Sequence, residues 1–199
     1  MKGTIFLVRH GEIDLGGEKR YIGSTNLPLC QRGIEDARKL KEYFSNKDLQ
    51  EAYTSPLLRC IETSEIIIKG RGIEKKIVND LREIHLGEWE YKTFAYIRNN
   101  FPKEYEERGR RIDSYQCPGG ESFQQVHNRV IPAFKRLVQA GGDDNILLVA
   151  HAGVNRVILG HIFGIPLSKI MDIHQPYGCV NKLLWDKDRQ RWNYDLLIL

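Results

Sequence analysis

Three stretches of this 199-residue chain hold side chains that bind and transfer anionic groups. Arg9 and His10 follow an apolar run near the N-terminus, and His151 follows a second apolar run. Arg59 comes shortly after Ser55 and Pro56, a pair typical of a helix start. An imidazole supplies a nucleophile or a proton carrier, and a guanidinium binds two phosphate oxygens at once. If the fold brings these side chains together, they suit the chemistry of phosphate.

Two strands and a helix are predicted to position these side chains. Residues 4–8 and 145–150 are short apolar runs that end in polar residues, which is typical of buried strands leading into loops. Ligands bind at the strand ends of an open α/β sheet because loops converge there with helix N-termini. We therefore expect the two strands to be neighbours in the sheet and Arg9, His10 and His151 to share one pocket.

Apolar residues recur at helical spacing in residues 34–44, 58–66 and 123–137. Ser55 is expected to cap the second of these helices, with Pro56 as its first residue, which places Arg59 just inside the helix. Strands and helices alternate along the chain, so the fold class is α/β.

One segment interrupts this alternation of strands and helices, and another comes after it at the C-terminal end. Residues 89–118 are rich in charged and aromatic side chains, and we interpret them as a helical insertion over the sheet. Residues 179–185 and 192–199 are expected to be closing strands, paired as a hairpin. The length suits a single domain of roughly 150 to 200 residues. We expect one domain over residues 1–199 with a lid-like insertion at about 89–118.

The composition excludes several classes of function. The chain is 41% hydrophobic and 28% charged, as in ordinary globular proteins. No apolar run approaches the ~18 residues of a membrane span, so a membrane-spanning function is excluded. The N-terminal apolar run is also shorter than the roughly 7 to 15 residues of a secretion signal.

The net charge indicates which kind of partner the chain binds, and the cysteines indicate its cellular compartment. Lys and Arg number 30 against 26 Asp and Glu, and the net charge of +4 is spread without a basic stripe. We therefore expect no nucleic-acid partner and a small anionic substrate. The four cysteines are widely scattered without a Cys-x-x-Cys pair, which indicates a reduced cytoplasmic protein.

Four motifs follow one another along the chain. They are Arg9-His10-Gly11-Glu12, Ser55-Pro56-Leu57-Leu58-Arg59-Cys60-Ile61-Glu62-Thr63, Leu81-Arg82-Glu83 with Gly87-Glu88-Trp89-Glu90, and His151-Ala152-Gly153. Each motif alone is weak, but four in this order are specific. Over nearly its whole length the chain resembles the histidine phosphatase superfamily, also called the phosphoglycerate mutase-like family. The resemblance implies a three-layer α/β/α sandwich with a mostly parallel central sheet and a helical insertion over the active site.

The resemblance also implies a role for each candidate catalytic residue. His10 would be the nucleophile and would form a phosphohistidine, while Arg9, Arg59 and His151 would hold the transferring phosphoryl group. Glu83 would protonate the leaving group. Phosphoryl transfer needs in-line positioning and positive charge around the equatorial oxygens, which these groups supply without a metal. We therefore expect neither a metal site nor a cofactor.

Further residues are expected to contribute to substrate binding. Residues 20–25 resemble the family's loop in which Gly23 and Ser24 would approach the phosphate, and Ala152 is expected to bind substrate beside His151. His85 is an alternative proton donor, because it would share a face with Glu83 if this segment were extended.

Several positions depart from the family pattern. Ile13 and Gly16 stand where family members often carry Thr or Ser and Asn, so one side-chain phosphate donor is missing. The backbone N–H groups of Gly16 and Gly17 are an alternative source of donors. Tyr91 replaces the glycine of the family's Trp-Glu-Gly, and we expect its ring near the mouth of the pocket.

A cluster of arginines in the predicted insertion admits two interpretations. Arg108, Arg110 and Arg111 are candidates for a clamp on a second anionic group of the substrate. The alternative is a solvated charge cluster, which is the common role of such a group in a polar segment.

Hydrolysis is the reaction that we expect. The mutases of the superfamily carry a longer insertion and an Arg-rich segment that this chain lacks. Residues 118–123 and 175–181 look most like the alpha-ribazole phosphatase branch of cobalamin biosynthesis, so a small phosphorylated substrate such as alpha-ribazole 5'-phosphate is expected. The alternatives are a phosphoglycerate mutase, a sugar bisphosphatase resembling fructose-2,6-bisphosphatase, and a low-turnover phospholigand-binding module. The oligomeric state is open, with a homodimer among the alternatives.

Overall fold

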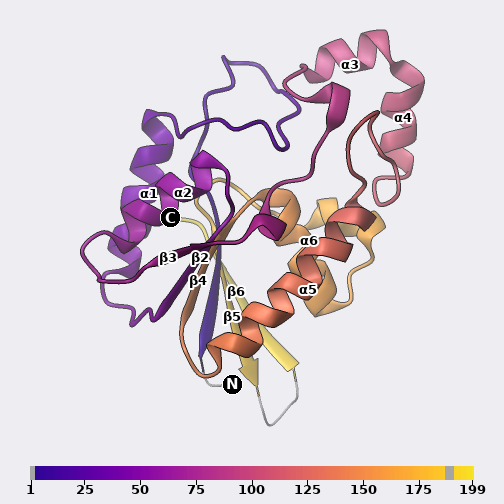
Figure 1. Ribbon diagram of the computed structural model, residues 1–199. Helices are drawn as coiled ribbons and strands as arrows, with labels where there is room; N and C mark the ends of the chain where they lie inside the picture. The colour runs from indigo at the N-terminus through magenta and orange to yellow at the C-terminus, as the bar shows by residue number, and fades with distance from the viewer. Residues whose placement is uncertain (1–2, 187–190) are drawn as a thin grey trace.

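A six-stranded sheet in the order β3-β2-β4-β1-β5-β6 forms the middle of the molecule (Figure 1). The computed structural model describes residues 3–186 and 191–199. The strands are β1 Thr4–Arg9, β2 Glu51–Thr54, β3 Lys75–Ile77, β4 Ile146–Ala150, β5 Val180–Asp186 and β6 Arg191–Leu197. β1 and β4 are parallel neighbours, as predicted, and Arg9 lies opposite Ala150. β5 and β6 pair antiparallel, as predicted, and the turn between them lies outside the described residues.

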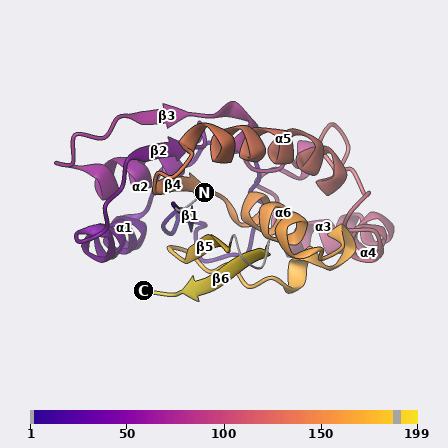
Figure 2. The ribbon, with the colours of Figure 1, turned by 90° about the horizontal axis from the view of Figure 1, so that it is seen from below.

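The α-helices are α1 Gln31–Phe44, α2 Leu58–Ile68, α3 Phe94–Asn100, α4 Pro102–Arg110, α5 Phe123–Gly141 and α6 Ala152–Phe163. Both faces of the sheet are covered by helices. Figure 2 shows α1 and α2 on one face of the sheet and α5 and α6 on the other. The predicted α/β class and three-layer arrangement are therefore confirmed. Within the described residues, no helix combines the length and the apolar character that crossing a bilayer would require.

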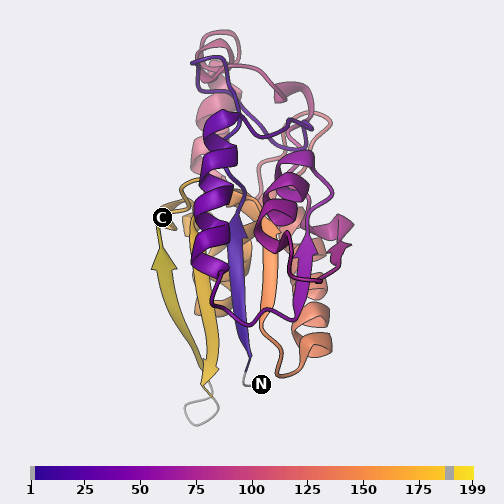
Figure 3. The same cartoon turned by 90° about the vertical axis from the view of Figure 1, so that its left-hand side faces the viewer.

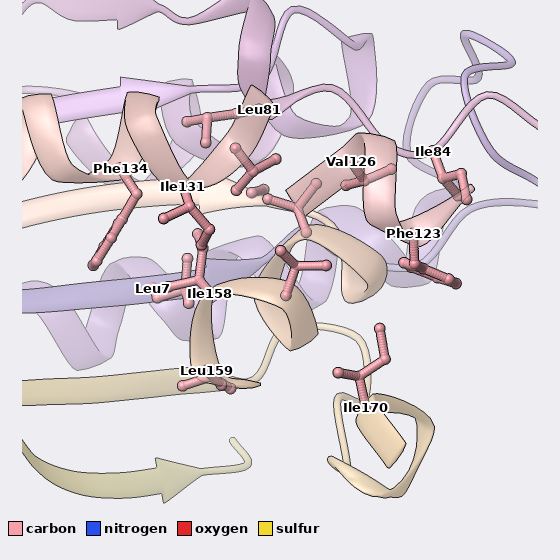
Figure 4. Close-up of a cluster of buried hydrophobic side chains, with 14 of the residues drawn as sticks. Leu7, Leu81, Ile84, Phe123, Val126, Ile131, Phe134, Ile158, Leu159 and Ile170 are labelled. Carbon is pink, nitrogen blue, oxygen red and sulfur yellow. The ribbon is translucent and has the colours of Figure 1, made fainter. Parts of the chain in front are cut away.

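The central strand β1 supplies both hydrophobic cores because its side chains alternate between the two faces. Phe6 and Val8 belong to the cluster that includes Phe44 of α1. Leu7 belongs to the other cluster, where it lies among side chains of α5 and α6 such as Ile158 (Figure 4). Burial on both faces explains why residues 4–8 form a continuous apolar run.

The segment after β3 leaves the sheet, and its helices α3 and α4 form a separate part, called the cover below. α3 and α4 lie beyond the ends at which β1 and β4 stop (Figures 1 and 3). The segment is held to the rest of the molecule by buried Trp89, Ile97 and Cys117. The helical character predicted for residues 89–118 is present, whereas their role as a lid and the single-domain organisation stay predictions.

The start of α2 differs from the sequence-based expectation. The helix begins at Leu58 with Leu57 in the cap position, so the assignment of Ser55 as the cap and Pro56 as the first helical residue is wrong. The Ser55 N–H still bonds to the carbonyl of Val149 at 3.0 Å, and its hydroxyl lies 2.7 Å from a ring nitrogen of His151. Ser55 is therefore held by the neighbouring strand and its histidine.

The core around β1 predicts a large effect of one truncation. Leu7→Ala should lower the free energy of unfolding by about 2–5 kcal/mol, because Leu7 is fully buried and its removal leaves a cavity. Urea titration measures this change, with Ile198→Ala, at a 60% exposed site, expected to stay within about 0.5 kcal/mol. Equal effects of the two substitutions would contradict the proposed core.

Candidate active site

His10 follows directly on β1, and its ring is held in one orientation. Its Nδ1 lies 2.7 Å from the carbonyl oxygen of Gly11, and because a carbonyl only accepts, Nδ1 carries the proton. The neutral ring therefore leaves the lone pair on Nε2. Burial lowers the pKa of His10 well below 6.5, and the charges of Arg59 and Arg9 lower it further. A buried, neutral imidazole with a free Nε2 can act as a nucleophile.

Arg59 is the second residue of α2, and its guanidinium is almost fully buried, with 1% of the side chain exposed. It donates to the carbonyls of Gly23 and Thr25 at 2.7 Å each, and through Nε to His151 Nδ1 at 3.2 Å. A guanidinium has five N–H groups, so one on each terminal nitrogen remains after these bonds to described residues. Arg59 lines a cavity together with His10, so these donors can serve an anion there.

His151 caps α6 at the end of β4, and both of its ring nitrogens have protein partners. Nδ1 accepts from Arg59, so in the neutral ring Nε2 carries the proton and donates to the Ser55 hydroxyl at 2.7 Å. Burial and the nearby Arg59 charge lower its pKa well below 6.5. The rings of His10 and His151 are 5.2 Å apart between centroids. In this arrangement His151 orients Arg59, and its predicted direct contact with phosphate stays a prediction.

Arg9 is fixed by the loop that precedes β5. Its Nη1 donates to the carbonyl of Gln175 at 2.6 Å, and its guanidinium lies 3.8 Å from the centre of the Tyr177 ring. The same ring is 5.6 Å from the ring of His10. Stacking on an aromatic face holds the planar guanidinium in one plane. Tyr177 therefore positions Arg9 beside His10.

Glu83 lies at the N-terminus of α6 and is buried. Its Oε2 accepts from the Gly153 N–H at 2.9 Å, and its Oε1 accepts from the Ile84 N–H at 3.0 Å. A Cβ on Gly153 would lie 2.4 Å from Glu83 Oε1, so only glycine lets the carboxyl group approach this closely. The helix start thus fixes the carboxyl group at the edge of the cavity.

Glu90 organises the loop that receives Arg59. Its carboxylate accepts from the backbone N–H groups of Gly23, Ser24, Thr25 and Leu86, and from the hydroxyls of Ser24 and Thr25. Burial alone would raise the pKa of Glu90, but these hydrogen bonds outweigh it and the pKa is lowered. The anchored loop turns two carbonyls toward Arg59.

Arg9, His10, Arg59 and Glu83 line a cavity of about 440 Å³. Its charged and titratable lining comprises His10, Glu83, Arg9, Arg20, Arg59, Arg108 and Arg156. The remaining lining is mainly apolar and aromatic and includes Tyr21, Phe123 and, from α4, Tyr105. A larger groove of about 680 Å³ beside Trp185 and Trp192 holds none of the predicted catalytic residues. An anion with an apolar body suits the smaller cavity.

Comparison of the sequence with models of protein families identifies the family of this chain. The model of the histidine phosphatase superfamily (branch 1) matches residues 5–195. The chain belongs to this superfamily.

Individual relatives carry different names. The adenosylcobalamin/alpha-ribazole phosphatase of Escherichia coli (strain K12) is 27% identical over 175 residues, which cover 88% of this chain and 86% of the relative. Human 6-phosphofructo-2-kinase/fructose-2,6-bisphosphatase 4 is 29% identical over 182 residues, or 90% of this chain but 37% of the relative. The solved structure of Bacillus stearothermophilus YhfR has a TM-score of 0.89 and 30% identity, covering 98% of this chain and 96% of that one. The chain is a phosphatase of the superfamily, and its relatives leave the substrate undecided.

Most residues expected from the histidine phosphatase pattern come together. Arg9, His10, Arg59, Glu83 and Ala152 line the cavity. His151 lies directly behind Arg59 and is fully buried.

The loop residues are placed differently. The N–H groups of Gly23 and Ser24 bond to Glu90, so their predicted contact with phosphate stays a prediction, while the Gly23 carbonyl holds Arg59. Gly16 is exposed and its N–H bonds to the Asp14 carboxylate, so it supplies no donor to the cavity. His85 is exposed and does not line the cavity, because residues 82–86 form a loop rather than a strand.

Tyr91 does not itself line the catalytic cavity, and its side chain is 47% exposed. Its ring lies 4.8 Å from the guanidinium of Arg20, which does line the cavity. Tyr91 has a φ of 65°, a conformation that favours glycine. The predicted effect of this ring on the mouth of the pocket stays a prediction.

Sequence reasoning missed Arg156, Tyr177 and the role of Glu90. Arg156 lines the cavity and its Nε donates to the Ile173 carbonyl at 2.9 Å, while burial and the charge of Arg9 lower its pKa. A signal for Arg156 was present, because it lies four residues after Ala152 and so shares its helix face. Tyr177 and Glu90 carry no comparable local signal.

The tight packing of Glu83 on Gly153 predicts a specific defect. Gly153→Ala should displace the carboxyl group and lower kcat/KM by about 100-fold for an alkyl phosphate, whose leaving group needs a proton. The loss in kcat/KM should be smaller for p-nitrophenyl phosphate, since nitrophenolate leaves without protonation. The kcat/KM values of both esters measure the difference, because kcat/KM reports only the steps up to departure of the alcohol. An equal loss on both esters would argue against Glu83 as the proton donor.

The lowered pKa of His10 predicts how kcat/KM changes as the pH is lowered. The nucleophilic neutral ring predominates above the folded-state pKa, which lies well below 6.5. We expect kcat/KM to persist as pH falls through 6.5 and to decline only well below it, because kcat/KM reports groups of the free enzyme. A profile of kcat/KM against pH measures this, and a histidine-type loss centred at or above 6.5 would contradict the assignment.

Proposed function

We propose that this chain hydrolyses phosphomonoesters of small metabolites through a phosphohistidine on His10 and without a metal. The observation that carries the proposal is the hydrogen bond from His10 Nδ1 to the Gly11 carbonyl, which leaves Nε2 unprotonated in the cavity. Arg9 and Arg59 supply fixed positive charge beside it. Phosphoryl transfer depends mainly on such positioning and charge.

The first step transfers the phosphoryl group to the protein. The lone pair on His10 Nε2 attacks phosphorus, the P–N bond forms and the P–O bond to the alcohol breaks. Glu83, in its protonated form, gives its proton to the departing oxygen. Arg9 and Arg59 bind the equatorial oxygens, on which charge is spread in the transition state.

The second step returns the protein to its starting state. Water attacks phosphorus while the Glu83 carboxylate takes the proton that water loses. The P–N bond breaks, its electron pair returns to Nε2, and inorganic phosphate is released. The same carboxyl group thus serves as acid and then as base.

The substrate proposal follows from the relatives and the lining of the cavity. Alpha-ribazole 5'-phosphate is the first candidate, because the Escherichia coli relative is named an alpha-ribazole phosphatase and the lining is rich in aromatic side chains. Fructose 2,6-bisphosphate is the second, supported by the name of the human relative. Residues 1–199 would act as one catalytic domain, with residues 89–118 as the lid. The four cysteines are unpaired, which supports the proposed cytoplasmic location.

Turnover of a generic ester tests the proposed chemistry. With EDTA present, the wild-type protein should release p-nitrophenol from p-nitrophenyl phosphate, and His10→Ala should reduce the rate by more than about 10³-fold. His161→Ala is the matched control, since this histidine is exposed and lies outside the cavity. Activity that requires an added metal, or that survives in His10→Ala, would overturn the proposal.

A second assay separates the alternative reactions. Interconversion of 2- and 3-phosphoglycerate would favour a mutase over a hydrolase. Tight binding of phosphate esters without turnover would favour a phospholigand-binding module.

A further inference from the structure

Three arginines lie in the last turn of α4 and directly after it, and they have different surroundings. Arg108 lines the catalytic cavity. Arg110 lies 3.9 Å from the Glu106 carboxylate and Arg111 lies 3.1 Å from the Glu107 carboxylate, and both arginines are exposed. Of the predicted clamp, only Arg108 can therefore meet a ligand in the cavity.

Arg108 carries a charge that no acidic side chain of the described residues pairs with. It is half-buried, and its guanidinium lies 5.4 Å from the centre of the Tyr21 ring. It also lies beside Cys117, where burial raises the pKa of the thiol and the Arg108 charge opposes that effect. A half-buried cation without a counterion is a favourable partner for an anionic group of a ligand.

Arg20 also lines the cavity, but its guanidinium already has partners within the protein. Arg20 donates to the Glu18 carboxylate at 2.7 Å, to the Tyr91 carbonyl at 3.1 Å and to the Leu15 carbonyl at 3.2 Å. Its charge is paired with the Glu18 carboxylate, and its guanidinium is held by these bonds. Arg108 is thus the available cation at the lid, as far as the described residues go.

The phosphoryl site and Arg108 belong to different parts of the fold. Arg9 and His10 come from the end of β1 and Arg59 from the start of α2, whereas Arg108 comes from α4 of the cover (Figure 1). Apolar and aromatic side chains such as Tyr21, Tyr105 and Phe123 line the same cavity. A ligand that fills the cavity therefore contacts positive charge from Arg9 and Arg59 and from Arg108, and apolar or aromatic side chains elsewhere.

We propose that Arg108 is a specificity-determining residue that binds a second anionic group, a carboxylate or a further phosphate, on the alcohol part of the substrate. The apolar body of that alcohol packs against the aromatic walls. This inference rests on the proposed function, because it concerns the substrate of the same site. It favours phosphate esters whose alcohol carries a second negative charge over esters of neutral alcohols. Of the two candidates above, fructose 2,6-bisphosphate carries such a charge and alpha-ribazole 5'-phosphate does not, so the role of Arg108 would reverse their order.

Three aryl phosphates of matched shape test the proposal. They are phenyl phosphate, 4-carboxyphenyl phosphate and 4-carbamoylphenyl phosphate, of which the last has the size of the carboxylate but no charge. Wild-type kcat/KM should be at least about tenfold higher for the carboxylate than for the amide, as expected for one charge-assisted hydrogen bond. Arg108→Gln should abolish this ratio and Arg108→Lys should retain part of it, because the lysine keeps a point charge.

The controls separate this inference from the proposed function. Arg110→Gln removes a neighbouring lid charge outside the cavity and should leave the ratio unchanged. A wild-type protein that hydrolyses the esters without a preference for the carboxylate, or an Arg108→Gln variant that lowers kcat/KM equally for carboxylate and amide, would overturn the role of Arg108. A wild-type protein that hydrolyses none of the three esters would instead contradict the proposed function.

Discussion

Burying the guanidinium of Arg59 is the constraint on which the rest of the site depends. A charge with 1% of its side chain exposed must have partners, because an unpaired buried ion costs several kcal/mol. The carbonyls of Gly23 and Thr25 and the ring of His151 provide them. The loop that offers these carbonyls is in turn anchored by Glu90. The charge proposed to bind phosphate is thus held in place by the protein's own groups, which is how electrostatic catalysis avoids reorganisation.

The strand ends were predictable from the sequence because local patterns determine them. The apolar runs before Arg9 and before His151 could only be buried strands, and their pairing places the two histidines together. The resemblance to the superfamily then indicated Arg59 and Glu83 as their companions. The α/β layers follow from the same alternation of strands and helices.

What the sequence did not reveal depends on contacts between distant residues. Gly23 and Glu90 are 67 positions apart, and Arg59 and His151 are 92 apart. No periodicity encodes such pairs, so the Gly23 loop was expected to face phosphate rather than Glu90. Ser55 makes another such distant contact, because its hydroxyl bonds to His151, 96 positions away. The hydroxyl also accepts from the Leu57 N–H at 3.4 Å, but the helix itself begins at Leu58. The left-handed backbone of Tyr91 was equally hidden, because the residue type does not suggest it.

The proposed mechanism assigns the catalytic cavity two regions. The groups proposed to act on the phosphoryl group lie at the end of β1, the start of α2 and the start of α6, and they are fixed by hydrogen bonds to neighbouring backbone. Tyr105 and Arg108 of α4 line the same cavity. The named relatives differ in their named substrates. The chemistry is therefore easier to assign than the substrate.

The attachment site of the phosphoryl group is the most direct measurement of the central claim. The protein would be mixed with p-nitrophenyl phosphate, quenched in alkali within milliseconds and digested, and the phosphohistidine isomer would be identified by mass spectrometry and phosphorus NMR. Because Nδ1 of His10 is bound to the Gly11 carbonyl, the account predicts phosphate on Nε2 of His10. Phosphate on Nδ1, on another residue or on no residue during active turnover would contradict it.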